Sequence, residues 1–597
     1  MAPIIFGESI VNFSLRPGDA RRRDWEGCDR KIFVDQLRLH VLALFALCLL
    51  LFFPFLGARD FWELENQYAE VVRVMLLEGD YLVPKVNDTF FPESPPLFFW
   101  LSAVICWFVG GVSEWAIRLP SALSATELVF IIYFFVRKHF NSRLAILSAV
   151  VLAASVLTVH VERHVPVNML FYLCIAAAMF LFMEVLVFDS ERRSHAYGAW
   201  LFMALACLSN GPVGLLFPAV AVCIYLALSR RWTRVASLRL FSGALLFMIV
   251  TVPWFAHLAR NGPADWLESI FVHLYLSLYS GPDQQIFFSF PLAFAPWCFL
   301  FIPAAICFWR EKSRAWEPPI LFFIIWFAVG LFLSVVSFGR HNHYLFLAYI
   351  PMAVGVGFYL DQLSTIESDD AVWVWTSYSV IFFGALLLLG GLSGPLIIWN
   401  MWPFLSVSVT LLGAAVAGLG GVFLYAWKHY GNLTLIAGFA AFPVVVNLLL
   451  QSLIFPDLNA FMFRPLAERM GAALAANPGA RLAIHKHRKS HEFNYYSRIK
   501  KIEVVSRPNL MSFFDRPGRQ LILLKTKDLE ELKKISLKNV DIVLDGTASG
   551  DHWVLLSSCR ESCEHLPNAA KPLDQASDTS TPPQGRDHEH GSLVSGR

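Results

Sequence analysis

Residues 40–57 read HVLALFALCLLLFFPFLG, an apolar stretch close to the roughly 20 residues that a helix needs to cross a bilayer. Similar stretches recur along the chain, and we expect helices at 40–57, 96–113, 119–136, 144–159, 168–187, 197–208, 211–228, 239–257, 289–308, 319–337, 344–361, 372–396, 404–427 and 432–455. Of all residues, 56% are hydrophobic and 16% are charged, against about 25% charged in a soluble domain. The sequence therefore predicts an α-helical polytopic membrane protein, and its net charge of +2 offers no basic surface for nucleic acid.

Clusters of basic residues orient the predicted helices, because positively charged loops are retained in the cytoplasm. They occur in the leader 1–39 and in the segments 230–234 and 310–314. With these three inside, the loop 258–288 and the region after residue 456 lie outside. We expect the protein to reside in the inner (plasma) membrane.

The number of crossings is constrained by the same rule. Seven candidate helices separate the leader from residues 230–234, yet both ends lie inside, which requires an even number of crossings. Either 96–113 or 197–208 is therefore not a full crossing. We expect about 13 crossings within the membrane domain, 40–455.

Residues 456–560 differ in composition from the membrane domain. Short strand-like apolar runs occur at 481–485, 502–505, 521–524, 540–544 and 553–556, with a helix-like stretch at 528–534. This alternation predicts a small α/β domain outside the cytoplasm. The tail 561–597 has almost no large apolar residues and is expected to be disordered. Cys559 and Cys563 fit either a disulfide or two free thiols.

The loop 58–95 between the first two apolar stretches is long and acidic. Its carboxylates are Asp60, Glu63, Glu65, Glu70, Glu78, Asp80, Asp88 and Glu93, and its stretch 68–77 has the spacing of an amphipathic helix that lies along the membrane interface. Two interpretations stay open: a solvated loop face, or a catalytic carboxylate with a clamp for substrate or metal. Long loops in compact domains are often functional.

Several ordered motifs follow in and after this loop. They are QYAE (67–70), MLLEGDYLVPKVND (75–88), ESPPL (93–97), EWAIRLPSAL (114–123), LSNGPVG (208–214) and SFGRHNHY (337–344). Together they resemble the C-type (GT-C) glycosyltransferases that use polyprenyl-phosphate sugars, in the branch of the bacterial lipid A aminoarabinose transferase and the protein O-mannosyltransferases. The resemblance implies the GT-C type fold with a C-terminal α/β domain, a polyprenyl-phosphate donor, an envelope acceptor (lipid A, protein or glycan) and no nucleotide cofactor.

The resemblance also implies site residues on the outer, periplasmic face. The family's acidic pair is incomplete here, which leaves Glu65 as the candidate general base and Glu63 as its alternative. Substrate and phosphate contacts are expected from Arg59, Lys85, Asn168, Asn210, Arg340, His343 and Tyr344. Glu93 and His273 could hold a divalent metal such as Zn, Mg or Mn, since both side chains are metal ligands.

Three family charges are neutral in this chain. Ser94 replaces the lysine of E-K-P-P, Asn210 the lysine of K-G-P, and Asn168 the aspartate of x-D-M-P-L. Two alternatives to a fully active transferase therefore remain: a catalytically impaired lipid-glycan binding or assembly protein, and a transporter or flippase for lipid-linked sugars. A transporter would favour an internal repeat, and the sequence shows none.

Overall fold

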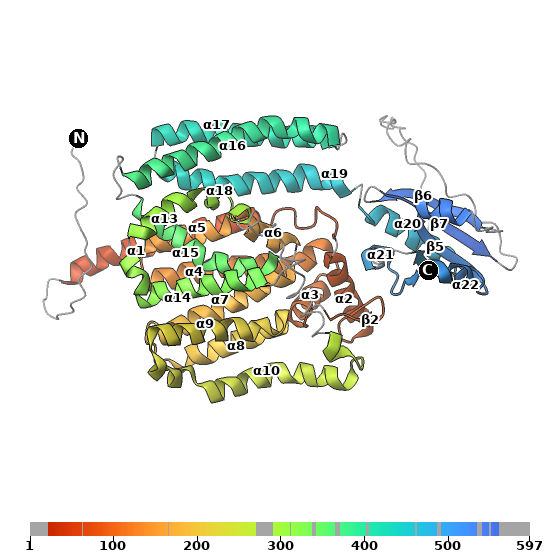
Figure 1. Cartoon of the computed structure of the whole chain (residues 1–597), viewed down its shortest axis with the longest axis horizontal. Helices are drawn as coiled ribbons and strands as arrows, with labels where there is room; N and C mark the ends of the chain where they lie inside the picture. The colour runs from red at the N-terminus through yellow and green to blue at the C-terminus, as the bar shows by residue number, and fades with distance from the viewer. Residues whose placement is uncertain are drawn as a thin grey trace, which may run out of the picture. The chain divides into compact units, whose positions relative to one another are not determined.

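The computed structural model describes residues 22–559, except 63, 93, 165, 270–290, 311, 337–341, 364–369, 402–404, 431, 460–461, 486–490, 534–539 and 549–550. The chain divides into two compact units, Met1–Asn459 and Ala460–Arg597. The first is helical, and the second contains the main sheet (Figure 1).

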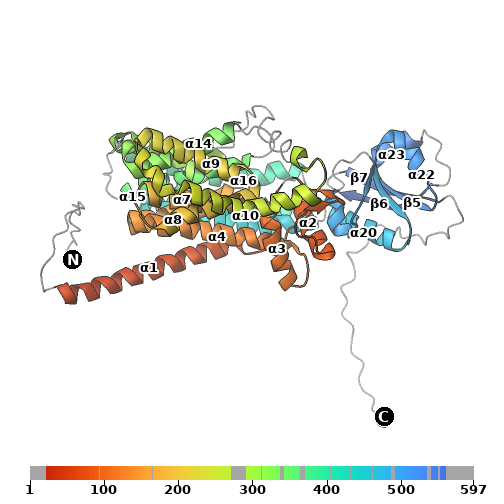
Figure 2. The same ribbon diagram turned by 90° about the horizontal axis from the view of Figure 1, so that it is seen from below.

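The first unit is a stack of long helices (Figures 1 and 2). Its α-helices are α1 (Arg22–Phe52), α2 (Leu64–Glu78), α3 (Leu97–Phe108), α4 (Glu114–His139), α5 (Ser142–Ala153), α6 (Val156–His164), α7 (Pro166–Leu186), α8 (Arg193–Asn210), α9 (Val213–Ser229), α10 (Leu240–Asn261), α13 (Phe301–Arg310), α14 (Pro318–Val336), α15 (Phe346–Gln362), α16 (Ala371–Met401), α17 (Ser406–Tyr430), α18 (Asn432–Leu449) and α19 (Phe455–Asn459). The predicted multi-pass helical fold is confirmed.

Burial separates the central helix from the peripheral ones. In the most apolar 18-residue stretch of α7, 94% of the residues are buried. This helix packs against α4 and α8. In the corresponding stretches of α1, α10 and α16, only 22% of the residues are buried. Because lipid is as apolar as a helix surface, these outer helices can leave apolar side chains exposed without cost.

The predicted count of about 13 crossings is not confirmed. Within the described residues, eight helices are long and apolar enough to cross, or nine if the pair α5 and α6, bent by 53°, is one span. Neither of the two suspect segments forms a helix that is both long and apolar enough to cross. Helix α3 has 12 residues and is about 18 Å long, and α8 has 18 residues but is less apolar.

The second unit is built on a five-stranded sheet in the order β4-β3-β5-β7-β6. The strands are β3 (Arg481–His485), β4 (Glu503–Val505), β5 (Arg519–Lys525), β6 (Val540–Ala548) and β7 (Asp551–Cys559), with helices α20 (Arg464–Ala475), α21 (His491–Ser497), α22 (Leu510–Phe514) and α23 (Thr526–Lys533). β3 pairs in parallel with β4 and β5, whereas β7 is antiparallel to β5 and β6. All five predicted strands are present, and the expected helix 528–534 corresponds to α23.

Glycines bring α16 and α17 into close contact. A Cβ on Gly391 would lie 2.5 Å from both the Gly413 carbonyl oxygen and the Ala417 nitrogen, whereas nothing lies within 4 Å of one on Gly390. Small residues are used in membranes to let helix backbones approach. Gly391 and its neighbour Gly390 therefore provide a test position and a control position in the same helix.

We predict that Gly391→Ala lowers the free energy of unfolding by about 1–3 kcal/mol, because the added methyl group overpacks the helix contact. Gly390→Ala should be neutral, or stabilising by up to about 1 kcal/mol through helix propensity. Unfolding of the two purified variants in mixed micelles measures both values. Equal effects of the two substitutions would contradict the close packing of α16 on α17.

Candidate functional site

The loop 58–95 is folded into a helix and a small hairpin. Helix α2, Leu64–Glu78, is longer than the expected 68–77, and β1 (Lys85–Val86) pairs antiparallel with β2 (Thr89–Phe90). Most of α2 is buried, from Glu65 through Val72 and at Val74 and Met75. The helix thus packs into the protein more deeply than a helix lying on the membrane interface.

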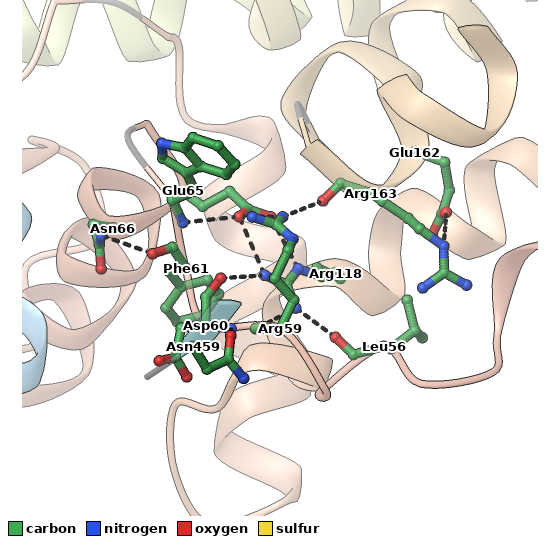
Figure 3. A network of polar contacts seen from close by, with 11 residues as sticks. Leu56, Arg59, Asp60, Phe61, Glu65, Asn66, Arg118, Glu162, Arg163 and Asn459 are labelled. Carbon is green, nitrogen blue, oxygen red and sulfur yellow. Dashed lines mark hydrogen bonds and ion pairs between the residues drawn. The ribbon is translucent and has the colours of Figure 1, made fainter. Parts of the chain in front are cut away.

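Glu65 is the central acid of this loop, and its carboxylate is fully paired. Oε2 accepts hydrogen bonds from Arg59 Nη2 (2.6 Å), Arg118 Nη2 (3.1 Å) and the Trp62 backbone N–H (3.1 Å), and Oε1 accepts one from Arg118 Nε (2.9 Å). Figure 3 shows both guanidinium groups beside the carboxylate. The bond to Trp62 resembles half of a capping box, in which a glutamate in the first turn reaches back to the N–H three residues earlier.

The ion pair is isolated from solvent. Glu65 is 0% exposed, Arg59 3% and Arg118 2%. Burial acts to raise the pKa of Glu65, but the charges of Arg118 and Arg59 outweigh it and hold this pKa below its usual value. Two short, charge-assisted contacts therefore keep the carboxylate ionised.

Arg118 also binds the backbone that leads into the loop. Its Nη1 donates to the carbonyl oxygens of Leu56 (2.6 Å) and Arg59 (2.8 Å), and its Nη2 to that of Asp60 (3.3 Å). Its side chain is buried, so Arg118 folds the loop 58–95 and does not face the lipid headgroups.

Residues distant in sequence complete the network around α1. Arg163 Nη2 donates to the carbonyl oxygens of Leu51 (3.1 Å) and Pro54 (2.9 Å), and Asn447 Nδ2 also donates to Leu51 (2.9 Å). Asn459 Nδ2 donates to the Ala58 carbonyl oxygen (2.7 Å), while its Oδ1 accepts the Asp60 N–H (3.0 Å; Figure 3). Sequence reasoning missed Asn447, an amide inside the apolar run 432–455, and Asn459, an amide shortly after it.

Arg59 was also predicted to bind phosphate. In the structure it donates to Glu65 and to the Arg163 carbonyl oxygen (3.2 Å), and its guanidinium carbon lies 5.7 Å from the Phe455 ring centroid. A phosphate would have to compete with the carboxylate for this side chain. The geometry instead gives Arg59 and Glu65 a role in shaping the loop.

Lys85 is more accessible than Arg59. Its side chain is 29% exposed, and Nζ lies 3.1 Å from Asp80 Oδ2 and 3.4 Å from Glu78 Oε2. Burial tends to lower the pKa of Lys85, but the hydrogen bond and charge of Asp80 raise it above its usual value. Lys85 is therefore a cation at every physiological pH. It is partly exposed, and an anionic ligand would share it with Asp80 and Glu78.

Two tryptophans hold the segment before Lys85. Trp254 Nε1 donates to the Leu82 carbonyl oxygen (2.8 Å) and Trp100 Nε1 to that of Tyr81 (2.7 Å). Val83 packs in one apolar cluster with Trp254 and with Leu208 of α8. The Lys85 segment is thus attached to the same end of α8 that carries Asn210.

Asn210 and Asn168 lie together. Asn210 Nδ2 donates to Asn168 Oδ1 across 3.4 Å, which joins the end of α8 to the start of α7. Tyr344 is 9% exposed, and its ring lies 6.4 Å from that of Phe171, one turn after Asn168. The start of α7 therefore brings together three predicted substrate-binding residues.

The other predicted residues lie outside the described part of the chain. These are Glu63, Glu93, His273 and Arg340, together with the side chain of His343. Among the described residues, no group of three or more His, Cys, Asp or Glu side chains is placed to hold a metal ion. The proposed ligands Glu93 and His273 are not among them, so the metal site stays a prediction.

Comparison with known proteins agrees with this architecture. Residues 93–257 match the family model described as dolichyl-phosphate-mannose-protein mannosyltransferase. The undecaprenyl phosphate-α-4-amino-4-deoxy-L-arabinose arabinosyl transferase of Erwinia tasmaniensis is 26% identical over 402 residues, covering 64% of this chain and 69% of that protein. An uncharacterized protein of Aquifex aeolicus is 29% identical over 293 residues, 48% of this chain and 65% of that one. The matches thus span about two thirds of the length of these relatives.

A solved structure extends the comparison to the whole fold. ArnT from Cupriavidus metallidurans, bound to undecaprenyl phosphate, superposes with a TM-score of 0.72 at 18% identity, covering 86% of this chain and 97% of that one. The predicted GT-C membrane fold is therefore confirmed. The resemblance to polyprenyl-phosphate-dependent glycosyltransferases is confirmed as well, by the family model and the named relatives.

We predict that Glu65→Gln lowers the free energy of unfolding by about 3–5 kcal/mol at neutral pH, because two buried arginines lose their counter-charge. The folded-state pKa of Glu65 is depressed, so the stabilisation is complete above the usual pKa of a glutamate and is lost as pH falls through the folded value. Thermal unfolding in detergent from pH 7 to about 3 should show the two proteins converging in acid.

Glu78→Gln serves as the matched control. Glu78 is 25% exposed and lies 3.4 Å from Lys85, so its loss should cost less than about 1 kcal/mol. If Glu65→Gln were as stable as this control, the buried ion pair would not organise the loop.

Proposed function

We propose that this chain is an integral-membrane glycosyltransferase that transfers a sugar from a polyprenyl-phosphate donor to an envelope acceptor on the periplasmic face of the inner membrane. Lipid A, a protein and a glycan are the acceptor classes. The similarity to arabinosyl transferases and to the mannosyltransferase family model supports this activity. The proposal concerns the whole protein, although its matches span only part of those relatives.

The observation that carries the proposal is the convergence of predicted residues at the start of α7. Asn210 contacts Asn168, and the Tyr344 ring lies 6.4 Å from that of Phe171, one turn later in α7. Val83, two residues before Lys85, packs with Leu208, two residues before Asn210. A cation and several polar side chains at the end of apolar helices suit a phosphate headgroup with an apolar tail. This arrangement supports the proposal that the site binds a lipid-linked sugar.

The reaction is a displacement at the anomeric carbon. An acceptor oxygen forms a bond to this carbon while the bond to the phosphate oxygen breaks, and polyprenyl phosphate leaves with the electron pair. Lys85 stabilises the negative charge on the departing phosphate. Asn168, Asn210 and Tyr344 orient the donor, which lowers the barrier by positioning.

The acceptor proton needs a separate group. If the acceptor is a hydroxyl, a general base takes its proton, which contributes about 10²–10⁴-fold. Glu65 is committed to Arg59 and Arg118, so we assign it the role of positioning the loop, and Glu63 is the base that we propose. If the acceptor is a phosphate, no base is needed.

We expect the purified protein in liposomes to convert a radiolabelled polyprenyl-phosphate sugar into product in the presence of envelope acceptors. Lys85→Ala should lower kcat by about 10²-fold, because a charge that faces the leaving group is lost. Lys85→Arg keeps the charge and should retain most of the activity. Donor binding without turnover in the wild-type protein would instead favour a binding or assembly factor, and export of intact donor would favour a flippase.

The acceptor class can be determined by comparing the envelopes of wild-type and deletion strains. Mass spectrometry of envelope lipids, glycans and proteins from a deletion strain should show one missing sugar, restored by the wild-type gene. If no sugar is missing from any of these three classes under conditions where the gene is expressed, the proposal of an envelope acceptor is wrong.

The asparagine pair gives a further prediction. The family carries opposite charges at these two positions, and here two amides contact each other. We expect Asn168→Asp and Asn210→Lys each to lower activity and stability, while the double variant recovers part of the loss through a restored ion pair. The coupling should be about 0.5–3 kcal/mol in a double-mutant cycle. Additive effects would show that the two positions act independently.

A further inference from the structure

Helix α4 carries a carboxylate in the middle of its span. Glu127 lies 13 residues after Glu114 and 11 before Lys138 within Glu114–His139, a helix whose hydropathy and length fit a membrane crossing. At about 1.5 Å per residue, Glu127 is about 16–20 Å from each of these charged ends. The hydrocarbon core is about 30 Å thick, so this side chain sits near its centre and is too short to reach either interface.

Glu127 is turned outward. Its side chain is exposed, as are Leu123 (43%) and Phe134 (49%), which continue the same stripe of α4. Helix α1, which packs against α4, exposes the apolar residues Leu42, Phe45 and Leu49. The carboxylate therefore stands in an otherwise apolar, membrane-facing surface.

The neighbouring polar residues of α4 are satisfied locally, and Glu127 is not. The hydroxyl of Ser124 donates to the Pro120 carbonyl oxygen (2.7 Å) and that of Thr126 to the Ala122 carbonyl oxygen (2.9 Å). Within the described part of the chain, Glu127 makes no hydrogen bond or ion pair. Ionisable residues inside a membrane are costly and usually face a partner or a polar path.

We propose that the Glu127 face of α4 is a docking surface for a membrane-spanning helix of a partner protein that carries a basic side chain at mid-membrane depth. A lipid cannot serve, because its polar groups lie at the interfaces and its tails have no donor. A second copy of this chain fits poorly, since a symmetric contact places the same patch on both sides and would set one carboxylate against another. Charge complementarity therefore points to a cation on a different helix.

The test uses two synthetic Leu-based peptides of about 20 residues, one with a central Lys and one without. Each carries a fluorescent donor, and the full-length protein in liposomes carries the acceptor. We expect the Lys peptide to bind the wild-type protein about 5- to 30-fold more tightly than Glu127→Leu, as for one interhelical polar contact in a bilayer. The all-Leu peptide should bind both proteins equally weakly.

Two aromatic variants test whether the surface, and not the charge alone, binds the helix. Phe134→Ala shortens the stripe next to Glu127 and should weaken binding of the Lys peptide. Phe241→Ala, on α10, removes an 88% exposed side chain elsewhere and should leave binding unchanged. Glu127→Gln keeps the shape of the side chain and should lose most of the preference for Lys.

Two results would overturn the proposal. Equal affinity of the Lys peptide for the wild-type protein and a folded Glu127→Leu variant would mean that the face simply contacts lipid. A wild-type dimer that dissociates in Glu127→Leu would identify a second copy of the chain as the occupant. Thermal unfolding of both Glu127 variants checks that each is folded.

Discussion

The buried contact of one carboxylate with two guanidinium groups organises the start of the loop 58–95. Glu65 fixes Arg59 and Arg118, and Arg118 in turn binds three carbonyl oxygens where the chain leaves α1. All three side chains are desolvated, so removing any one of them would leave buried charge without its partner. The path of the chain from Leu56 to Asp60 and the start of α2 follow from it, whereas Trp100 and Trp254 hold the segment before Lys85.

The sequence was sufficient for the fold because its signals are local. Apolar blocks located the helices, and the central strand β5, buried along Gln520–Leu524, appeared as the continuous run LILL. The number of crossings was harder to predict, since composition does not distinguish the short α3 from a full span. The 53° bend between α5 and α6 likewise left no separate signal in hydropathy.

The candidate site was predictable only in part. Motif order made Glu65 and Lys85 candidates, but a one-dimensional pattern does not show whether a carboxylate faces substrate or an arginine. Arg118 lies 53 residues from Glu65, so their pairing depends on tertiary structure. The contact between Asn168 and Asn210 changes how the missing family charges are interpreted, because two of the three losses fall on one contact. A paired replacement preserves electroneutrality, whereas a single one would leave a charge unbalanced.

The amides of Asn447 and Asn459 have a consequence for biogenesis. They bind backbone at Leu51, Ala58 and Asp60, at sequence separations of 396, 401 and 399 residues. At about 5–20 residues per second, the ribosome needs roughly 20–80 s to make the intervening chain. During that interval the segment 51–60 lacks the contacts that these two amides supply. Its final conformation is therefore reached only after α18 and α19 have been inserted, which makes the last membrane helices a checkpoint for maturation of the first loop.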